Sequence, residues 1–406
     1  MKNENTSAKP PRDRAAALLA LQNLKMARSA HAYVRGATSQ FYVWLRESSG
    51  HSIPTGPPVW ICGDCHVGNL GPVANAAGKI DIEIRDLDQT VIGNPAHDLI
   101  RLALSLATAA RGSDLPGVTT ATMLEEMIIG YRCALARRPR PGADLGPKPE
   151  SVRVIMRQAM QRTWRHLAEE RLEDVKPTIP LGKRFWPLSA SEKKEVQRIF
   201  ALPDIRKLVT SVKARRDDAR VEVLDAAYWR KGCSSLGRLR FAVLVGVGKA
   251  SKNDDFCLFD IKEAVAAAAP GSASSRMPRD NAKRVVQGAL QLSPYLGERM
   301  KAARFLKRSV FVRELMPQDL KLEIDQLTRE EAVNAARFLA GVVGAAHARQ
   351  MDASSRRAWR SALARNRSKR FDAPSWLWSS VVALMASHEA GYLEHCRQYA
   401  RTARAL

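Results

Sequence analysis

Apolar positions near the start of the chain recur at helical spacing. Within residues 13–46, Leu18, Leu21 and Leu24 lie three positions apart in a segment rich in helix-forming residues. Gly36 interrupts the pattern, and a group of aromatic residues follows it. The segment therefore predicts a helix, a loop and a second helix.

The pattern changes to short strands between residues 58 and 92. The segment PVWICGD is apolar, and in KIDIEIRD the residues Ile80, Ile82 and Ile84 alternate with charged residues. These two strands bracket a loop. A helix follows, and we expect Asp98 to be its N-cap. The segment stays largely helical to about residue 135.

The rest of the chain combines helices with one small sheet. Residues 150–220 have the charged, amphipathic pattern of helices, whereas RLRFAVLVGV, DDFCLFDIKEA and SVFVREL predict three strands, with a helix over 279–293. Thr328 and Glu331 form a capping box that predicts a long helix, and at least one more helix follows it. The predicted fold class is α+β, predominantly helical with a small antiparallel sheet.

Composition is that of a folded globular protein. The 406 residues are 45% hydrophobic and 26% charged, and six scattered cysteines are too few for a disulfide framework. No apolar run reaches the length of a membrane span, and the N-terminal segment is polar where a signal peptide would be apolar. We therefore expect a soluble, cytoplasmic protein with no transmembrane segment.

Charge is the abnormal bulk property. The chain has 65 Lys and Arg against 41 Asp and Glu, a net charge of +24 and a pI near 10.2. Such a field attracts polyanions, so nucleic acid, an anionic membrane surface and phosphorylated small molecules are all candidate partners. The basic residues are spread along the chain with few aromatic residues among them, so nucleic acid is not the favoured partner.

The run GDCHVGN at residues 63–69 carries the most informative chemistry. A phosphoryl-transfer site needs a carboxylate to accept the hydroxyl proton, and an amide and a second carboxylate to hold magnesium. Asp64 fits the catalytic base, while Asn69, Asp86 and Asp88 fit the metal site. We expect Asp86 to contact the metal directly and Asp88 to support it from the next layer of residues. His66 could bind metal or phosphate, or could serve as a structural histidine; for the whole run the alternative is a polar turn capped by short side chains.

These motifs resemble those of a known group of kinases. GDCHVGN, with the following DLD and NPAHDL, resembles the GDxHxxN, D and GDPxxDL series of aminoglycoside-phosphotransferase-like kinases. From about 20 to 352 the chain also resembles the bacterial domain-of-unknown-function family 2252, with YVRG before the motif and FDIKEA, KRVVQG and AAHARQMD after it. The resemblance implies a protein-kinase-like bilobal fold that uses ATP and Mg²⁺, with an unidentified acceptor.

The order of the elements differs from that of ordinary kinases, in which the glycine-rich loop and its lysine precede the catalytic loop. Here the candidates follow it: Gly232 and Gly237, with Ser234 and Ser235 between them, would cover the phosphates, and Lys262 would contact them.

The resemblance therefore implies a circularly permuted kinase fold. Residues 1–220 would form a helical lobe with the catalytic and metal loops, 221–320 the small nucleotide-binding lobe, and 321–406 the remainder of the helical lobe. Arg35 is a further phosphate candidate, for which a plain turn is the alternative, and Arg313 and Lys321 are others.

Departures from the kinase pattern leave alternatives open. Cys62 occupies the position that kinases give to His, and no glutamate lies in 279–293 to pair with Lys262. Cys62 and Cys65 have the spacing of half a zinc site, without a second pair of ligands. We expect an ATP-dependent phosphotransferase acting on a hydroxyl of an unidentified, anionic acceptor. The alternatives are an inactive kinase-like protein that binds nucleotide or nucleic acid through its basic surface, and a nucleotidyl transferase.

Overall fold

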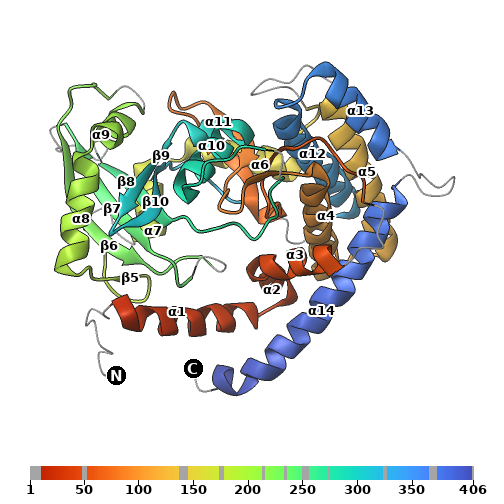
Figure 1. Cartoon of the computed structure of the whole chain (residues 1–406), viewed down its shortest axis with the longest axis horizontal. Helices are drawn as coiled ribbons and strands as arrows, with labels where there is room; N and C mark the ends of the chain where they lie inside the picture. The colour runs from red at the N-terminus through yellow and green to blue at the C-terminus, as the bar shows by residue number, and fades with distance from the viewer. Residues whose placement is uncertain are drawn as a thin grey trace.

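The chain folds into a sheet-containing half and a helical half (Figure 1). A computed structural model describes residues 11–47, 53–136, 145–172, 178–212, 215–232, 236–248, 256–272, 275–322, 327–364 and 373–404. The predicted mixture of helices with small antiparallel sheets is confirmed. None of the helices in these ranges is long and apolar enough to span a bilayer.

The largest sheet has six antiparallel strands in the order β5-β6-β7-β8-β10-β9. The three strands predicted in this region are confirmed as β7, β8 and β10, and β5, β6 and β9 were not predicted. The strands are β5 (Phe185–Trp186), β6 (Val221–Trp229), β7 (Arg240–Val247), β8 (Phe256–Glu263), β9 (Met300–Phe305) and β10 (Arg308–Leu315).

Helices cover both faces of this sheet, which explains why β7 and β8 are buried along almost their whole length. Val243, Val245 and Ile261 point to one face and pack against α8 (Ala190–Ala201) and α9 (Pro203–Thr210). Leu244 and Leu258 point to the other face and pack against α7 (Trp164–Leu172). The sheet and its covering helices thus begin well before residue 221, where the small lobe was expected to start.

The predicted helix over 279–293 is α10 (Asn281–Leu292), which is followed by the short α11 (Pro294–Gly297). Asp280 caps α10, and its carboxylate accepts hydrogen bonds from the backbone amides of Ala282 and Lys283. The helix packs on β9 and β10 on one side and on β1 on the other. It therefore lies between the large sheet and the loops that carry the candidate site.

Two small two-stranded sheets hold those loops. β1 pairs with β4 and β2 pairs with β3, both antiparallel. The 3₁₀ helix η1 connects the candidate catalytic loop to β2. The elements are β1 (Val59–Ile61), η1 (Val67–Asn69), β2 (Leu70–Ala74), β3 (Ile80–Ile84) and β4 (Val91–Gly93).

The helical half is built around α5 (Gly117–Ala136) and α12 (Arg329–Ala348). They approach closely at Gly130, where a Cβ atom would lie 2.0 Å from the Arg337 carbonyl oxygen. Thr328 caps α12 as predicted, its side chain accepting a bond from the Glu331 amide. The remaining helices are α2 (Ala30–Gly36), α3 (Thr38–Glu47), α4 (Pro95–Gly112), α6 (Glu150–Gln161), α13 (Ala353–Ala364) and α14 (Ser375–Arg404).

Helix α1 (Pro11–Met26) runs along both halves (Figure 1). Near its start, Arg14 Nη1 lies 2.6 Å from Glu192 Oε1 of α8, and both side chains are buried. Near its end, the Asn23 carbonyl oxygen lies 2.8 Å from His395 Nε2 of α14. The first and last helices of the described chain are therefore in contact.

Candidate functional site

Asp64 lies in the loop between β1 and η1 and is only 8% exposed. The Thr38 hydroxyl donates to its Oδ2 at 2.9 Å, and Arg101 Nε donates to its Oδ1 at 3.0 Å. Asn69 Nδ2 donates to the Asp64 backbone carbonyl at 2.9 Å, which fixes the amide of Asn69. The two residues singled out in GDCHVGN are therefore held together as one rigid unit.

A fully buried carboxylate, Asp98, braces this loop. Its oxygens accept hydrogen bonds from the backbone amides of Cys62 at 2.7 Å and Gly63 at 2.9 Å. His347 Nε2 lies 3.2 Å from Asp98 Oδ2. The predicted bracing role is confirmed, but the N-cap prediction was wrong, because α4 begins at Pro95 and its cap is Asn94.

Gly63 is the position at which this loop requires glycine. Its φ of 75° lies in the left-handed region, and a Cβ atom would lie 2.2 Å from the Gln89 carbonyl oxygen. The Tyr42 hydroxyl donates to the Gly63 carbonyl oxygen at 2.5 Å. The loop can thus pack directly against the segment that follows Asp86 and Asp88.

Lys262 meets those two aspartates from β8. Its Nζ lies 2.5 Å from Asp88 Oδ2 and 3.2 Å from Asp86 Oδ2, although 176 residues separate Lys262 from Asp86. The lysine side chain is 2% exposed and that of Asp88 11%, whereas that of Asp86 is 41% exposed. The strand lysine and the metal-loop carboxylates therefore share one site.

The carboxylates of this pair differ in their proton affinity. Burial by itself would raise the pKa of Asp86, but the charges of Lys262 and Arg313 outweigh it and hold the pKa well below its ordinary value. Burial and the neighbouring charge of Asp86 raise the pKa of Asp88. Asp86 is therefore the carboxylate that stays ionised and available to a cation.

A second buried charge cluster lies on the same face of the sheet. Arg240 donates to both oxygens of Asp260 at 2.9 and 2.6 Å, and Arg313 donates to its Oδ2 at 3.0 and 3.2 Å. Asp260 is fully buried, and these two cations hold its pKa below the ordinary value although burial opposes them. Arg240 lies opposite Lys262 in the sheet register, so both clusters face the loops.

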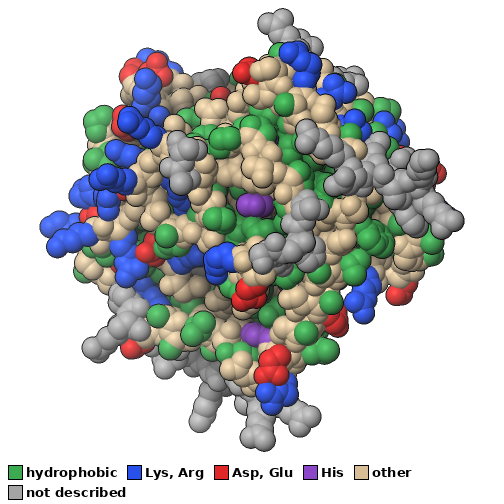
Figure 2. All heavy atoms as spheres, turned by 45° about the vertical axis from the view of Figure 1, so that its right-hand side comes forward, with side chains coloured by type: hydrophobic (Ala, Val, Ile, Leu, Met, Phe, Trp, Pro, Cys, Tyr) green, Lys and Arg blue, Asp and Glu red, His purple; other side chains and the backbone are tan. Residues whose placement is uncertain are grey.

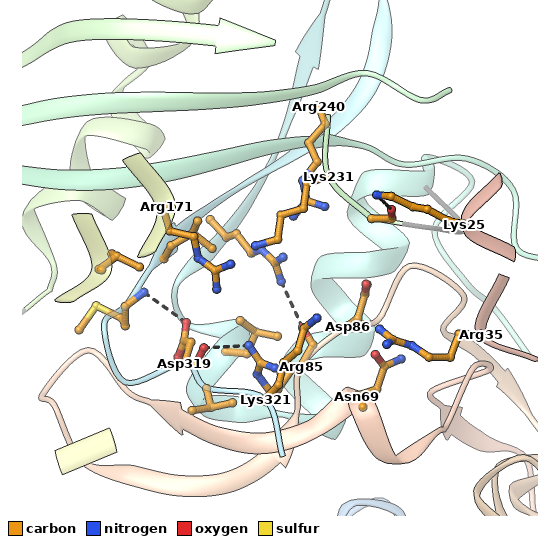
Figure 3. Close-up of a pocket in the computed structure, with 18 of the residues that line it drawn as sticks. Lys25, Arg35, Asn69, Arg85, Asp86, Arg171, Lys231, Arg240, Asp319 and Lys321 are labelled. Atoms are coloured by element: carbon orange, nitrogen blue, oxygen red, sulfur yellow. Dashed lines mark hydrogen bonds between the residues drawn. The ribbon is translucent and has the colours of Figure 1, made fainter. Parts of the chain in front are cut away.

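A pocket of about 470 Å³ opens between the sheet and the loops (Figure 3). Asn69, Asp86 and Arg35 lie together on one side of it, and Arg171 and Lys231 lie on the other. Nine of the residues that line it are Lys or Arg and two are Asp. The basic residues are Lys25, Arg28, Arg35, Arg85, Arg171, Lys231, Arg240, Arg313 and Lys321.

Asp64 and Lys262 are bonded to residues that line this pocket. Asn69 donates to the backbone carbonyl of Asp64, and Lys262 donates to the carboxylate of Asp86. Arg35, Arg101, Asp64 and Asp86 all lie close enough to His66 for their charges to affect its pKa, which burial lowers to about 3. His66 is therefore a neutral, buried imidazole beside the convergent charges.

The residues present fit magnesium better than zinc. Asn69 and Asp86 offer an amide oxygen and a carboxylate to the pocket, and Mg²⁺ in nucleotide sites uses one or two carboxylates plus phosphates and water. In the described ranges, no three His, Cys, Asp or Glu side chains are grouped to hold a metal. Cys62 and Cys65 are free and buried, and their mutual hydrogen bond and burial raise the pKa of Cys62, which disfavours the thiolate that zinc requires.

The glycine-rich segment is described only at its ends. Gly232 and Gly237 have φ values of 104° and 93°, in the left-handed region that glycine favours. Gly232 lines the pocket, and its carbonyl oxygen accepts a bond from Lys25 at 3.0 Å. Ser234 and Ser235 lie outside the described residues.

Most cations of the pocket were not predicted from sequence, although one pattern in the strands gives a signal. Arg240, Asp260 and Arg313 are charged residues within largely apolar strands, and each occupies the same face as Lys262. A charge at a period-2 position of a buried strand requires a partner, so these residues could have been grouped with the lysine. No comparable signal marks Arg101, Thr38, Arg85 or Arg171, which come from separate elements.

The net positive charge is not confined to the pocket. Figure 2 shows Lys and Arg side chains gathered along the left edge of one face, with Asp and Glu among them. Elsewhere on that face, hydrophobic and uncharged side chains separate the charged ones. Positive charge is therefore found on the surface as well as in the pocket.

Comparison with known proteins assigns a family. No curated protein and no solved structure matches the chain. Residues 14–398 match the family described as "Uncharacterized protein conserved in bacteria (DUF2252)". Because the match spans almost the whole sequence, the chain belongs to this bacterial family.

Proposed function

We propose that the protein transfers the γ-phosphoryl group of ATP to a hydroxyl group of an acceptor. The observation that carries the proposal is the contact of Lys262 with Asp86 and Asp88, since Asp86 also lines a basic pocket together with Asn69. A lysine on a strand, a metal-binding Asp and an Asn five residues after a candidate base are the parts that kinase-type phosphoryl transfer uses.

Each residue then has a definite role. Asn69 and Asp86 would hold magnesium, which neutralises the phosphates, and Lys262 would contact a phosphate once Asp86 turns toward the cation. Arg35 lies beside them and would bind a phosphate oxygen. The acceptor oxygen forms a bond to the γ-phosphorus, the bond to the bridging oxygen breaks, and ADP leaves.

Asp64 would orient the acceptor hydroxyl and accept its proton. Its pairing with Arg101 holds the carboxylate in one orientation. Kinase-type transfer depends mainly on positioning, because its transition state is loose. Thr38, Arg101 and Asn69 fix the position of Asp64, which is the property that this role requires.

The arrangement supports a permuted kinase-like fold as part of the proposal. The lysine strand β8 is followed by α10 and then by the hairpin β9–β10, as a kinase lysine strand is followed by a helix and further strands. The contact between α1 and α14 supports permutation, because chain ends that lie close together can be joined and the chain reopened elsewhere.

One observation favours a second candidate, transfer of a nucleotidyl group. Arg171 and Lys231 line the side of the pocket away from Arg35 and Asn69 (Figure 3). ATP bound with its terminal phosphates on that side would present its α-phosphorus to the acceptor. The acceptor oxygen would then bond to the α-phosphorus, and pyrophosphate would leave.

The test is labelling of a bacterial extract with ATP carrying ³²P at either the γ or the α position. We expect γ-label to be transferred, and Asp64→Asn to abolish that transfer while ATP affinity, measured by calorimetry with magnesium, stays within about threefold. Asp217→Asn, at an exposed position, is the matched control. Transfer of α-label alone would select the second candidate, and unchanged labelling by Asp64→Asn would reject the role of Asp64.

A further inference from the structure

The side of the pocket away from Asn69 and Arg35 contains more positive charge than the protein neutralises. Lys231 follows β6, Arg171 lies in α7 and Arg85 follows β3, and all three line the pocket. We call these three residues the basic cluster. They come from three separate parts of the chain, and Arg171 and Lys231 lie together on one side in Figure 3.

The carboxylates nearby are already committed to other cations. Asp260 is bonded to both Arg240 and Arg313, and Asp319 is bonded to Arg299 through both of its oxygens. Glu170 lies 2.9 Å from Arg171 and is shared with Arg162. In the described residues none of these carboxylates forms an ion pair with Lys231, although the charge of Asp260 acts on it.

Each member of the basic cluster has a nitrogen atom without a hydrogen-bond or ion-pair partner among the described residues. Lys231 Nζ lies 4.4 Å from the centre of the Trp229 ring and has no ion pair with a carboxylate in the described part of the chain. Arg85 donates through Nη2 to the Asp319 backbone carbonyl at 2.8 Å, and its buried Nε has no partner there. The buried Nε of Arg171 likewise has no partner among the described groups.

The electrostatics point the same way. Burial, followed by the charges of Arg171 and Arg240, lowers the pKa of Lys231 well below its ordinary value. Cations this close repel one another, and a bound anion would reverse that repulsion.

The geometry points to a phosphate-binding subsite at the basic cluster, separate from the metal end of the pocket. A phosphate group offers three acceptor oxygens in different directions, which suits one ammonium and two guanidinium groups arriving from three elements. The pocket volume of about 470 Å³ accommodates a second charged group beside the one at Asn69 and Asp86.

Two sources can supply this phosphate. It can belong to a phosphorylated acceptor that binds beside ATP, or to the terminal phosphates of ATP bound in the reversed direction. The subsite goes beyond the proposed function, because it requires a phosphate at the basic cluster whichever group is transferred.

The test is calorimetric titration of the full chain with inorganic pyrophosphate, without magnesium, at near-physiological salt. We expect Lys231→Gln and Arg171→Gln each to weaken binding by about 10- to 100-fold, the loss expected for a charge-assisted bond to an anion. Lys207→Gln, at an exposed position on α9, removes the same charge and should leave the affinity unchanged. Without anion, Lys231→Gln should unfold at a urea concentration no lower than the wild type, because it removes a repelled cation.

The outcomes separate the subsite from the proposed transfer. Pyrophosphate binding that the two cluster variants leave intact, or that Lys207→Gln weakens equally, would overturn the subsite. Repeating the titration with a saturating non-hydrolysable ATP analogue and magnesium distinguishes the sources: additional binding indicates a phosphorylated acceptor, and exclusion indicates the reversed nucleotide. Because pyrophosphate binding needs no turnover, the subsite can hold even if no labelled product forms in the transfer assay.

Discussion

Replacing Lys262 by methionine tests both the stability and the chemistry of the candidate site. Methionine keeps most of the volume of the side chain and removes the charge. The lysine is 2% exposed and contacts Asp88 at 2.5 Å and Asp86 at 3.2 Å, so the variant removes the cation closest to two carboxylates that face each other. The partners are also far apart in sequence, so the contact exists only in the folded chain.

The expected cost follows from the burial of each partner. Removing one partner of a buried ion pair costs about 3–5 kcal/mol, because the other charge remains buried and unpaired. Asp88, 11% exposed, contributes most of this, whereas Asp86 is 41% exposed and water screens its contribution to at most about 1 kcal/mol. In the double variant Lys262→Met with Asp88→Asn the unpaired buried charge is gone, so we expect a coupling energy of about 2 kcal/mol.

The measurement is urea unfolding of the wild type, both single variants and the double variant, together with the affinity of each for ATP and magnesium. The double variant should regain stability relative to Lys262→Met but not nucleotide affinity, because the lysine that we propose to contact the phosphates is still absent. Lys283→Met, on the exposed side of α10, is the matched control. Strictly additive unfolding energies would refute the Lys262–Asp88 pairing, and wild-type ATP affinity in the double variant would refute the role of Lys262.

Two further predictions concern carboxylates behind the site. Burial raises the pKa of Glu83 to about 7 although Ser293 and the Tyr295 amide donate to it. Because the folded pKa of Glu83 lies above the unfolded value of 4.5, the group contributes to folding stability fully below about pH 4.5. This contribution, of the order of 3 kcal/mol, is lost as the pH rises through 7. Glu83→Gln should therefore gain urea stability relative to the wild type between about pH 5 and pH 8, and parallel pH profiles would contradict the shift. Asp98→Asn places a side-chain amide nitrogen against one of the two backbone amides that donate to Asp98. We therefore expect the free energy of unfolding to fall by about 2 kcal/mol and the catalytic loop to be held less firmly. An unchanged urea midpoint would show that the charge of Asp98 does not hold the loop.

The sequence contained enough information to predict β7, β8 and β10, but not β5, β6 or β9. β7 and β8 are apolar runs because both of their faces are covered, so they are recognisable without tertiary information. β9 is an edge strand of mixed sequence that is buried mainly at its ends, Met300 and Phe305. Its pairing with β10, rather than its own pattern, makes it a strand.

Site prediction shows the same division between local and tertiary information. The position of Asp98 in the first turn of α4 is local, and the Asn94-Pro95 pair, a good N-cap followed by proline at N1, was the signal that would have placed the cap correctly. Arg85 and Arg171, in contrast, lie in segments whose charges are indistinguishable from solvated surface charges until folding brings them to one pocket. A basic pocket assembled from single residues of many elements leaves no motif in the sequence.

The missing glutamate on α10 is compatible with the proposed transfer, because another residue pairs with Lys262 and another links α10 to the site. In protein kinases that glutamate pairs with the lysine and links the helix to the nucleotide site. Here Asp88 pairs with Lys262, and Arg284 of α10, itself 5% exposed, donates to the backbone carbonyls of Asp88, Thr90 and Val265. The guanidinium of Arg284 therefore links α10 to the loop that carries Asp86 and Asp88, through hydrogen bonds to backbone carbonyl oxygens. Because Arg284 bonds the segment after Asp86 on one side and the segment after Lys262 on the other, a shift of α10 would move both halves of the site together.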